Sequence, residues 1–272
     1  MTTLATLATP SRPTPIARVV GLFLLALLAT VALIALDLAI QTTTLQVVQQ
    51  TLVFLVVLAV QLFGLWRGVA RARLGGTTWL AIAAPVVAWL AVVWWLAPNG
   101  GFRGLIGLPL AITLPLIVGV PLLLRSRRVG LLLDALPATW LVGVQVYRIF
   151  GSVFLVAWLL CNVPGIFAVP AGVGDVLVGL LALPAAALLL AGSGGARTAA
   201  IAWNVLGILD LADAVLLGFL SSPTPFQLLA TNFSGPNLLT DYPLVMIPAF
   251  AVPASLLLHA LSLRQLGRAT GR

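Results

Sequence analysis

Long runs of apolar residues, separated by short polar segments, dominate the chain. A transmembrane helix requires roughly 20 mostly apolar residues, and the chain contains a series of runs of about that length. They are residues 19–40, 45–66, 78–97, 105–124, 138–161, 174–191, 198–220 and 242–263. The pattern predicts an all-α membrane protein, built as one bundle of about eight transmembrane helices.

The segments between these runs define the expected organisation. Residues 1–17 are predicted to be a disordered cytoplasmic N-terminus, residues 18–128 to hold four spans, and residues 129–272 to hold an interfacial segment and four more. The interfacial segment is the short stretch 131–137. Residues 162–173 contain two prolines and two glycines, so they are expected to form a re-entrant or interfacial turn at the outer surface. Such non-helical backbone survives at membrane depth only when it is buried in protein or faces water.

The arginines test the number of spans. If the N-terminus is cytoplasmic, 12 of the 14 arginines fall in inside segments, and only Arg103 falls in an outside loop. An excess of basic residues in short loops marks the cytoplasmic side, and an odd number of spans would break the alternation. We therefore expect eight spans with both termini in the cytoplasm. The remaining arginine, Arg148, falls inside the fifth span.

The composition excludes a soluble domain. Hydrophobic residues make up 61% of the chain and charged residues only 7%, whereas soluble domains carry roughly 25% charged residues. Every basic residue is arginine, which fits a GC-rich bacterial genome as well as any functional demand. The net charge of +8 arises from clusters between spans. It does not form a basic surface with interleaved aromatic residues, so no nucleic-acid partner is expected.

Few residues are available for metal or cofactor chemistry. The single cysteine, Cys161, excludes an internal disulfide, and the single histidine, His259, excludes zinc or haem sites that need several histidines. The absence of lysine excludes a Schiff base. We therefore predict no metal site and no cofactor. The expected partners are the lipid bilayer and a small-molecule or lipid ligand.

Proline recurs in the fourth and eighth runs, where each residue removes a backbone hydrogen bond and favours a kink. These prolines are Pro109, Pro115, Pro121, Pro243, Pro248 and Pro253. Two interpretations remain open at this point: bent helices that pack normally, or broken helices that line a cavity, as in transporters.

One ionisable residue near mid-depth of the fifth run identifies a candidate site. Charge at membrane depth is costly, so Arg148 is a functional candidate by default. Gln145 and Ser152 lie three residues before and four residues after it, and would share its helix face. Tyr147 is adjacent but is expected to point elsewhere.

Three aspartates are the candidate partners of Arg148. Asp210 and Asp213 lie three residues apart on one face of the seventh run, and Asp175 is expected to begin the sixth helix and to cap it. A buried arginine cannot lose its charge, so it should pair with Asp210, Asp213 or both. The pair is either a structural contact that fixes helix register or a site that handles a ligand or a proton.

Further polar residues lie in other spans. Asn204 is expected to hydrogen-bond a neighbouring helix, and His259 to be structural or interfacial near the inner end of the last span. A polar stripe follows the second span and is explained by interhelical hydrogen bonds; it comprises Gln46, Gln49, Gln50 and Gln61. The aspartates on the outer side could form an acidic vestibule; they are Asp37, Asp175, Asp213 and Asp241.

Two segments carry a resemblance to known sequences. Residues 145–175 contain a Q-x-Y-R segment followed by P-A-G-x-G-D, and the WNVLGILDL segment surrounds Asn204 and Asp210. In these features roughly the last half of the chain resembles uncharacterised bacterial polytopic integral membrane proteins. That resemblance implies a bacterial cytoplasmic (inner) membrane as the location of this multi-pass protein. It implies no known activity, and it suggests that these polar positions belong together.

Three functions are compatible with these observations. The first is a small-solute or proton-linked transporter, or a ligand-binding membrane protein, whose site surrounds Arg148. The second is a membrane-embedded enzyme that acts on a lipid or isoprenoid through an aspartate. The third is a structural or assembly protein in which Arg148 and its aspartates form a purely structural pair. Sequence motifs for phosphate loops, catalytic triads and zinc proteases are absent.

Overall fold

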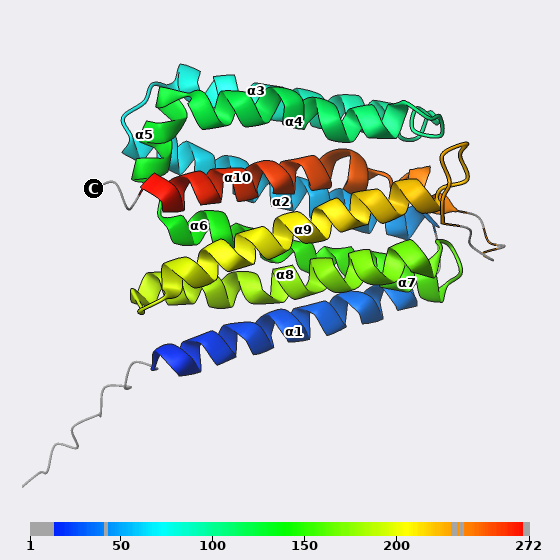
Figure 1. The fold of residues 1–272 in the computed structure, drawn as a ribbon, viewed down its shortest axis with the longest axis horizontal. Helices are drawn as coiled ribbons and strands as arrows, with labels where there is room; N and C mark the ends of the chain where they lie inside the picture. The colour runs from blue at the N-terminus through cyan, green and yellow to red at the C-terminus, as the bar shows by residue number, and fades with distance from the viewer. Residues whose placement is uncertain (1–13, 41–42, 230–232, 234, 236, 269–272) are drawn as a thin grey trace, which may run out of the picture.

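A computed structural model describes residues 14–40, 43–229, 233, 235 and 237–268, and this part of the chain is helical, without strands. Eight helical segments within it are long and apolar enough to cross a membrane. They run side by side along one axis (Figure 1). The prediction of an all-α protein with about eight transmembrane helices is confirmed at this level.

The first four spans are uninterrupted α-helices. They are α1 (Pro15–Ala39), α2 (Thr43–Arg71), α3 (Gly76–Leu96) and α4 (Gly107–Arg125). Thr14 caps α1 by accepting a hydrogen bond from the amide of Ala17, and Pro15 occupies the first turn, where it loses no helical hydrogen bond. Helix therefore begins inside the segment 1–17 that was predicted to be disordered. The rest of that segment, residues 1–13, lies outside the described residues.

A short helix follows the fourth span, in the region where the sequence predicts an interfacial piece. This helix, α5 (Arg127–Ala135), is capped by the hydroxyl of Ser126. Asp134 of α5 forms an ion pair of 2.6 Å with Arg268 at the end of the last span, so the two segments are in contact. Gln265 adds two hydrogen bonds of 2.6 Å to backbone carbonyls at the end of α5.

The fifth span is not one α-helix. It consists of α6 (Ala138–Gly143), the 3₁₀ helix η1 (Val144–Gly151) and α7 (Ser152–Leu159). A 3₁₀ helix seldom exceeds three or four residues, and longer stretches inside a span often mark strain or a functional hinge. Winding at three residues per turn places Gln145, Arg148 and Gly151 on one face, instead of the expected face with Ser152.

The sixth span corrects the expectation of a re-entrant turn at 162–173. Helix α8 (Gly165–Ala191) is continuous from Gly165, so the turn is confined to the few residues before it. Pro164 lies at the cap, where its missing N–H costs no helical bond. Pro170 lies inside the helix, and transmembrane helices tolerate such prolines. Asp175 consequently does not begin a helix but lies about ten residues along α8.

The last two spans are α9 (Ala196–Ser221) and a composite helix. Between them lies the short 3₁₀ turn η2 (Leu238–Thr240). The composite helix starts with one π-type turn, η3 (Ile247–Ala251), and continues as α10 (Val252–Arg268). It therefore begins later than residue 242, where the sequence pattern placed its start. Proline interrupts regular winding here, and π-turns within helices are frequent at functional sites.

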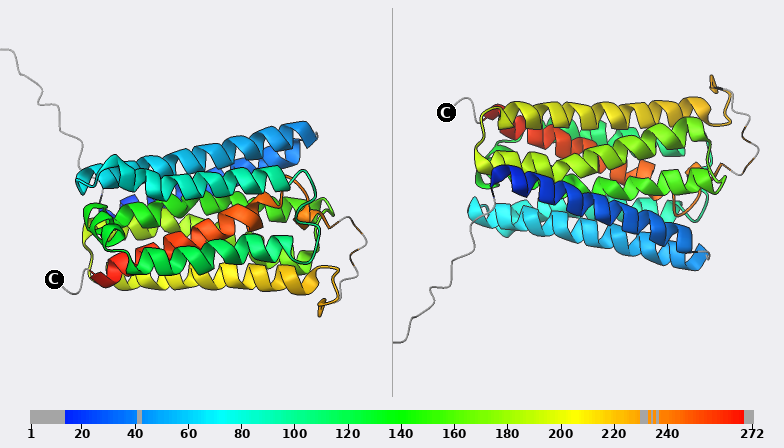
Figure 2. Two further views of the ribbon diagram at one scale, coloured as in Figure 1. Left: turned by 90° about the horizontal axis from the view of Figure 1, so that it is seen from above. Right: turned by 90° about the horizontal axis from the view of Figure 1, so that it is seen from below.

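Helix α8 occupies the middle of the second half of the chain, where it packs against α1, α6, η1, α7 and α9. The start of α1 and the end of α10 lie at the same end of the bundle, called the terminal end below (Figures 1 and 2). Alternating spans bring the described arginine clusters to that end, apart from Arg103 and Arg148. The orientation of this end toward the cytoplasm remains a prediction.

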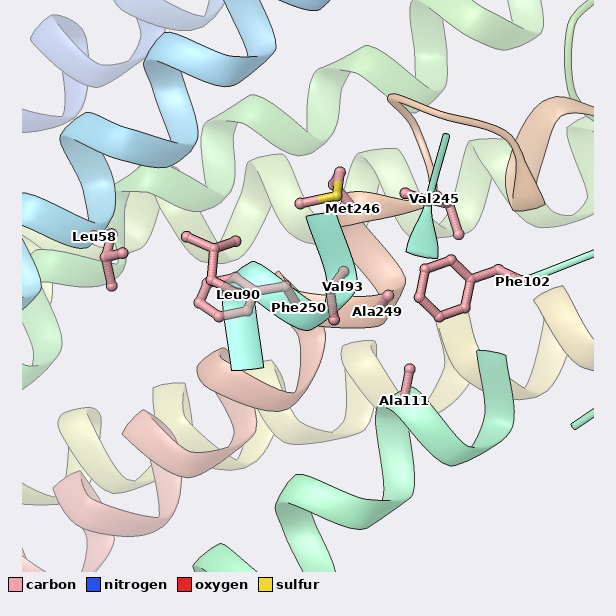
Figure 3. Packing of buried hydrophobic residues seen from close by; sticks show 10 residues of the cluster. Leu58, Leu90, Val93, Phe102, Ala111, Val245, Met246, Ala249 and Phe250 are labelled. Carbon is pink, nitrogen blue, oxygen red and sulfur yellow. The ribbon is translucent and has the colours of Figure 1, made fainter. Parts of the chain in front are cut away.

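A hydrophobic core joins the first and second halves. Leu58, Leu90 and Val93 from α2 and α3 pack against the start of the last span and the two residues before it (Figure 3). The other members of the cluster are Ala97, Phe102, Ala111, Val245, Met246, Ala249 and Phe250. The indole N–H of Trp89 also donates to the carbonyl of Ala249 at 3.3 Å. This packing fixes η3 against the rest of the bundle.

Candidate functional site

The candidate site is centred on the side chain of Arg148, which is only 3% exposed in the middle of the fifth span. Its Nε donates to Asp175 Oδ1 on α8 at 2.7 Å. Its Nη2 contacts the same oxygen at 2.7 Å and also donates to Asp210 Oδ2 on α9. One guanidinium group thus links three spans, and it pairs with two carboxylates at once.

The remaining donors of Arg148 point toward α9 and α10. Nη1 donates to the carbonyl of Gly207 at 3.2 Å and contacts His259 Nε2 at 3.3 Å. A guanidinium carries five N–H groups and cannot be deprotonated in a protein. The five groups therefore have protein acceptors: two carboxylates, one backbone carbonyl and one imidazole nitrogen. Arg148 is saturated by its own chain.

A chain of hydrogen bonds continues from His259 toward the terminal end. Because Arg148 must donate to Nε2, the proton of the neutral imidazole resides on Nδ1, which donates to Asn204 Oδ1 at 3.0 Å. The amide of Asn204 then donates to Ser262 Oγ at 3.0 Å and to the carbonyl of Ala200 at 2.7 Å. His259, Asn204 and Ser262 are all buried. This chain orients Arg148 from the side opposite to the carboxylates.

The cluster of Arg148, Asp175 and Asp210 does not balance in charge. Its one cation faces two carboxylates, whose side chains are 14% and 11% exposed, and the histidine contributes no charge in the tautomer just described. An uncompensated charge is costly in a region of low dielectric. The excess negative charge favours the uptake of one proton or one cation.

Glycines create the space that the cluster occupies. A Cβ atom at Gly174 would overlap Asp210 Oδ1, and one at Gly151 would overlap the carboxyl group of Asp175. A Cβ atom at Gly207 would likewise overlap the ring of His259. The 3₁₀ helix η1 and helices α8, α9 and α10 can therefore bring these groups together because the facing positions lack side chains.

The other residues that the sequence singled out are placed differently. Gln145 and Ser152 are fully buried on either side of Arg148, and their polar side-chain atoms have no hydrogen-bond partner among the described residues.

Tyr147 was expected to point away from the cluster, but its hydroxyl lies beside the cluster, 2.6 Å from Ser255 Oγ. Asp213 is exposed on α9 and forms no ion pair within the described part of the chain.

Two neighbouring cavities lie between the cluster and the end of the bundle opposite to the terminal end. The central cavity, of about 80 Å³, is lined by Arg148 and Asp175. The mouth cavity, of about 390 Å³, is lined by Asn162 and Asp241. Both are lined by four shared residues at their junction, which are Asp37, Gln49, Gln50 and Val153.

The walls of the central cavity include both irregular helical segments. Tyr147 and Arg148 come from the 3₁₀ helix η1, and Ile247 and Phe250 come from the π-turn η3. The last span thus lines the cavity through a π-turn, while its helix runs without a break from Ile247 to Arg268. The fourth span keeps α-helical winding through Pro115 and Pro121.

Sequence reasoning missed the contact between His259 and Arg148, and it placed the histidine near the interface. A signal was present, because Ser255, His259 and Ser262 recur at spacings of four and three residues and so occupy one face of the last span. The structure directs this polar face toward Tyr147, Arg148 and Asn204.

Comparison with known proteins adds one family. The model of a family described as a domain of unknown function (DUF8737) matches residues 105–267, more than half of the chain. No curated protein and no solved structure matches. The matched region contains Arg148, Asp175, Asp210 and His259, whereas helices α1 to α3 precede it.

Proposed function

The chain belongs to the DUF8737 family, and from the geometry of the buried cluster we propose that it is a proton-linked transporter of a small solute. The proton-binding element is the carboxylate pair Asp175 and Asp210, which Arg148 holds together. The solute route is the pair of cavities that leads to Asp175.

The observation that carries this proposal is the saturation of Arg148 by two carboxylates beside a cavity. The arginine has no free donor for an anionic solute, so its role is to keep one of the two carboxylates ionised. The other carboxylate supplies the excess charge, which one proton neutralises. Ionisable groups at membrane depth that pair with one another are typical of proton relays.

Proton binding has a direct structural consequence in this arrangement. When one carboxylate accepts a proton, it loses its charge and its ionic contact with Arg148 weakens. The contacts that Arg148 makes between α8 and α9 then change in strength. Since Arg148 lies on η1, whose irregular winding faces η3 across the central cavity, these two segments are the expected sites of movement.

A purely structural pair is the principal alternative. It accounts for the saturation of Arg148, but it predicts no cavity beside the pair, and Arg148 and Asp175 both line the central cavity. The enzyme hypothesis needs an aspartate that is free to act as an acid or a metal ligand beside a lipid or isoprenoid substrate. Asp210 turns toward Arg148 while Asp213 is exposed, and no group of three or more candidate ligands gathers within the described residues.

Proton movement in proteoliposomes tests the proposal. The purified protein is reconstituted with a pH-sensitive dye inside the vesicles, and an imposed potential drives proton entry. We expect a flux that is lost in Asp210→Asn and in Asp175→Asn, because either variant leaves one carboxylate matched to one arginine. Asp213→Asn is the matched control and should retain the flux.

The Arg148→Gln variant decides whether the arginine takes part. If this variant folds, as judged by a single symmetrical peak in size-exclusion chromatography, and every measured flux equals that of the wild type, the mechanism is wrong.

A further inference from the structure

We propose that the two cavities bind a small organic ammonium ion with an apolar substituent, and that Asp37 is the residue that selects for its positive charge. This inference rests on the proposed function and specifies the class of solute. Three observations support it: the negative charge of the residues that line the cavities, the apolar side chains of the central cavity, and a hydrogen-bond acceptor without a donor where the cavities meet.

Asp37 is a carboxylate without a basic partner. It accepts a hydrogen bond from Gln49 Nε2 at 2.5 Å, and none of the ion pairs found in the described part of the chain includes it. It lines both cavities, so a solute that moves from the mouth to the central cavity passes it. Asp241 also lines the mouth cavity, but Arg103 compensates it at 2.7 Å.

The charge along the route is therefore negative. The central cavity is lined by Asp37, Asp175 and Arg148, and Arg148 is shared with Asp210. Because that arginine is saturated, an anionic solute would find no free donor there and would face an uncompensated carboxylate. A cation is attracted at Asp37 and is not repelled by an unpaired base.

The other side chains that line the central cavity are mostly apolar, so they favour a solute with an apolar substituent. Phe54, Phe150 and Phe250 line the central cavity together with aliphatic side chains from α2 and η3. Aromatic rings favour cations that carry apolar groups, because the ring face is electrostatically negative. A volume of about 80 Å³ restricts the inner position to a solute of a few heavy atoms.

Gln50 is the residue whose hydrogen-bond acceptor has no donor where the two cavities meet. Its Oε1 atom is buried and has no hydrogen-bond partner in the described residues, and the residue lines both cavities next to Asp37. A buried acceptor without a donor costs free energy until it finds one. The N–H groups of a primary ammonium ion are suitable donors, and they can reach a carboxylate and an amide oxygen together.

Three probes that share an isobutyl group test the charge preference: isobutylammonium, the neutral isobutanol and the anionic isovalerate. Each is titrated into the full-length protein in lipid nanodiscs, binding is followed by saturation-transfer NMR, and empty nanodiscs provide the background. We expect isobutylammonium to bind about tenfold more tightly than isobutanol, a difference that one cation–carboxylate contact can provide. Isovalerate should not bind.

Variants assign the effect to Asp37. Asp37→Asn keeps the side-chain shape and should weaken isobutylammonium binding about tenfold while isobutanol binding stays the same. Asp213→Asn removes a carboxylate that lines neither cavity and should change neither. Equal binding of isobutylammonium and isobutanol, no binding of the ammonium probe, or unchanged binding by a folded Asp37→Asn protein would overturn the inference.

The two proposals fail separately. If proton flux depends on Asp175 and Asp210 but no ammonium probe binds, the solute class is wrong and the proton-linked function stands. If isobutylammonium binds in an Asp37-dependent way while Asp210→Asn leaves proton flux intact, the binding site stands and the proton-linked function falls.

Discussion

The first four spans and the last four spans of this protein use their residues differently. In the most apolar windows of α1 to α4, between 11% and 22% of residues are buried, compared with 28% to 56% in the last four spans. The first group therefore presents mostly a surface for lipid. The second group encloses a polar cluster, and apolarity alone does not distinguish the two, because lipid and protein interior are equally apolar.

The two groups also divide the candidate site. Arg148, Asp175, Asp210 and His259 lie in the last four spans and within the region matched by the family model. Asp37, Gln49 and Gln50 lie on α1 and α2, before that region. The two proposals therefore place proton handling and solute selection in different parts of the chain.

The largest loss of stability is expected from a substitution that breaks the buried cluster. Arg148→Gln leaves two carboxylates in the interior without a base and should lower the free energy of unfolding by about 3–5 kcal/mol. The measurement is thermal unfolding in detergent, compared between variants. Arg103→Gln is the control, since its ion pair with Asp241 is exposed and should contribute at most about 1 kcal/mol. Equal losses in both variants would contradict the contrast between the two regions.

A glycine substitution tests whether the cluster depends on close helix approach. Gly174→Ala should cost about 1–3 kcal/mol, because the added Cβ overlaps Asp210 Oδ1 and displaces this carboxyl group from Arg148. Gly21→Ala on α1 is the matched change in the first group, where a Cβ meets no atom within 4 Å. It should be neutral or slightly stabilising. A harmless Gly174→Ala would show that the Asp210 carboxyl group can move without loss of stability.

Loss of the hydrogen-bond chain behind Arg148 should lower the free energy of unfolding by less than loss of Arg148 itself. Asn204→Ala removes the acceptor for His259 Nδ1 and a donor to Ser262, leaving buried polar atoms unsatisfied at a cost of about 1–3 kcal/mol. Asn99→Ala is the control, since Asn99 donates from an exposed position. If thermal unfolding shows no difference between the two variants, the chain does not fix the position of Arg148.

The smallest effect is expected at an aspartate just outside the cluster. Asp213→Asn changes an exposed residue without an ion pair in the described region, so the free energy of unfolding should change by no more than about 0.5 kcal/mol. A larger loss would place Asp213 inside the cluster, where the sequence first put it.

Hydrophobic runs in the sequence predicted about eight spans, and the cost of a buried charge predicted that Arg148 pairs with Asp210, Asp213 or both. The structure pairs Arg148 with Asp210 and Asp175. The sequence pattern misplaced Asp175, since the prolines and glycines before it indicated a turn, whereas a cap at Pro164 allows helix from Gly165. It could not predict η1 or the contact with His259. In an apolar helix no amphipathic face reveals which side meets a neighbour, and small residues such as Gly174 decide how closely helices approach.

Infrared difference spectroscopy tests the central claim most directly. Protein films are titrated between acidic and alkaline pH, and the carbonyl stretch of protonated carboxyl groups is recorded for the wild type and for three variants. If the pair binds the proton, a band of the wild type disappears in both Asp175→Asn and Asp210→Asn and remains in Asp213→Asn. A spectrum that is identical in the wild type and in both cluster variants would show that Asp175 and Asp210 bind no proton, and would contradict the account.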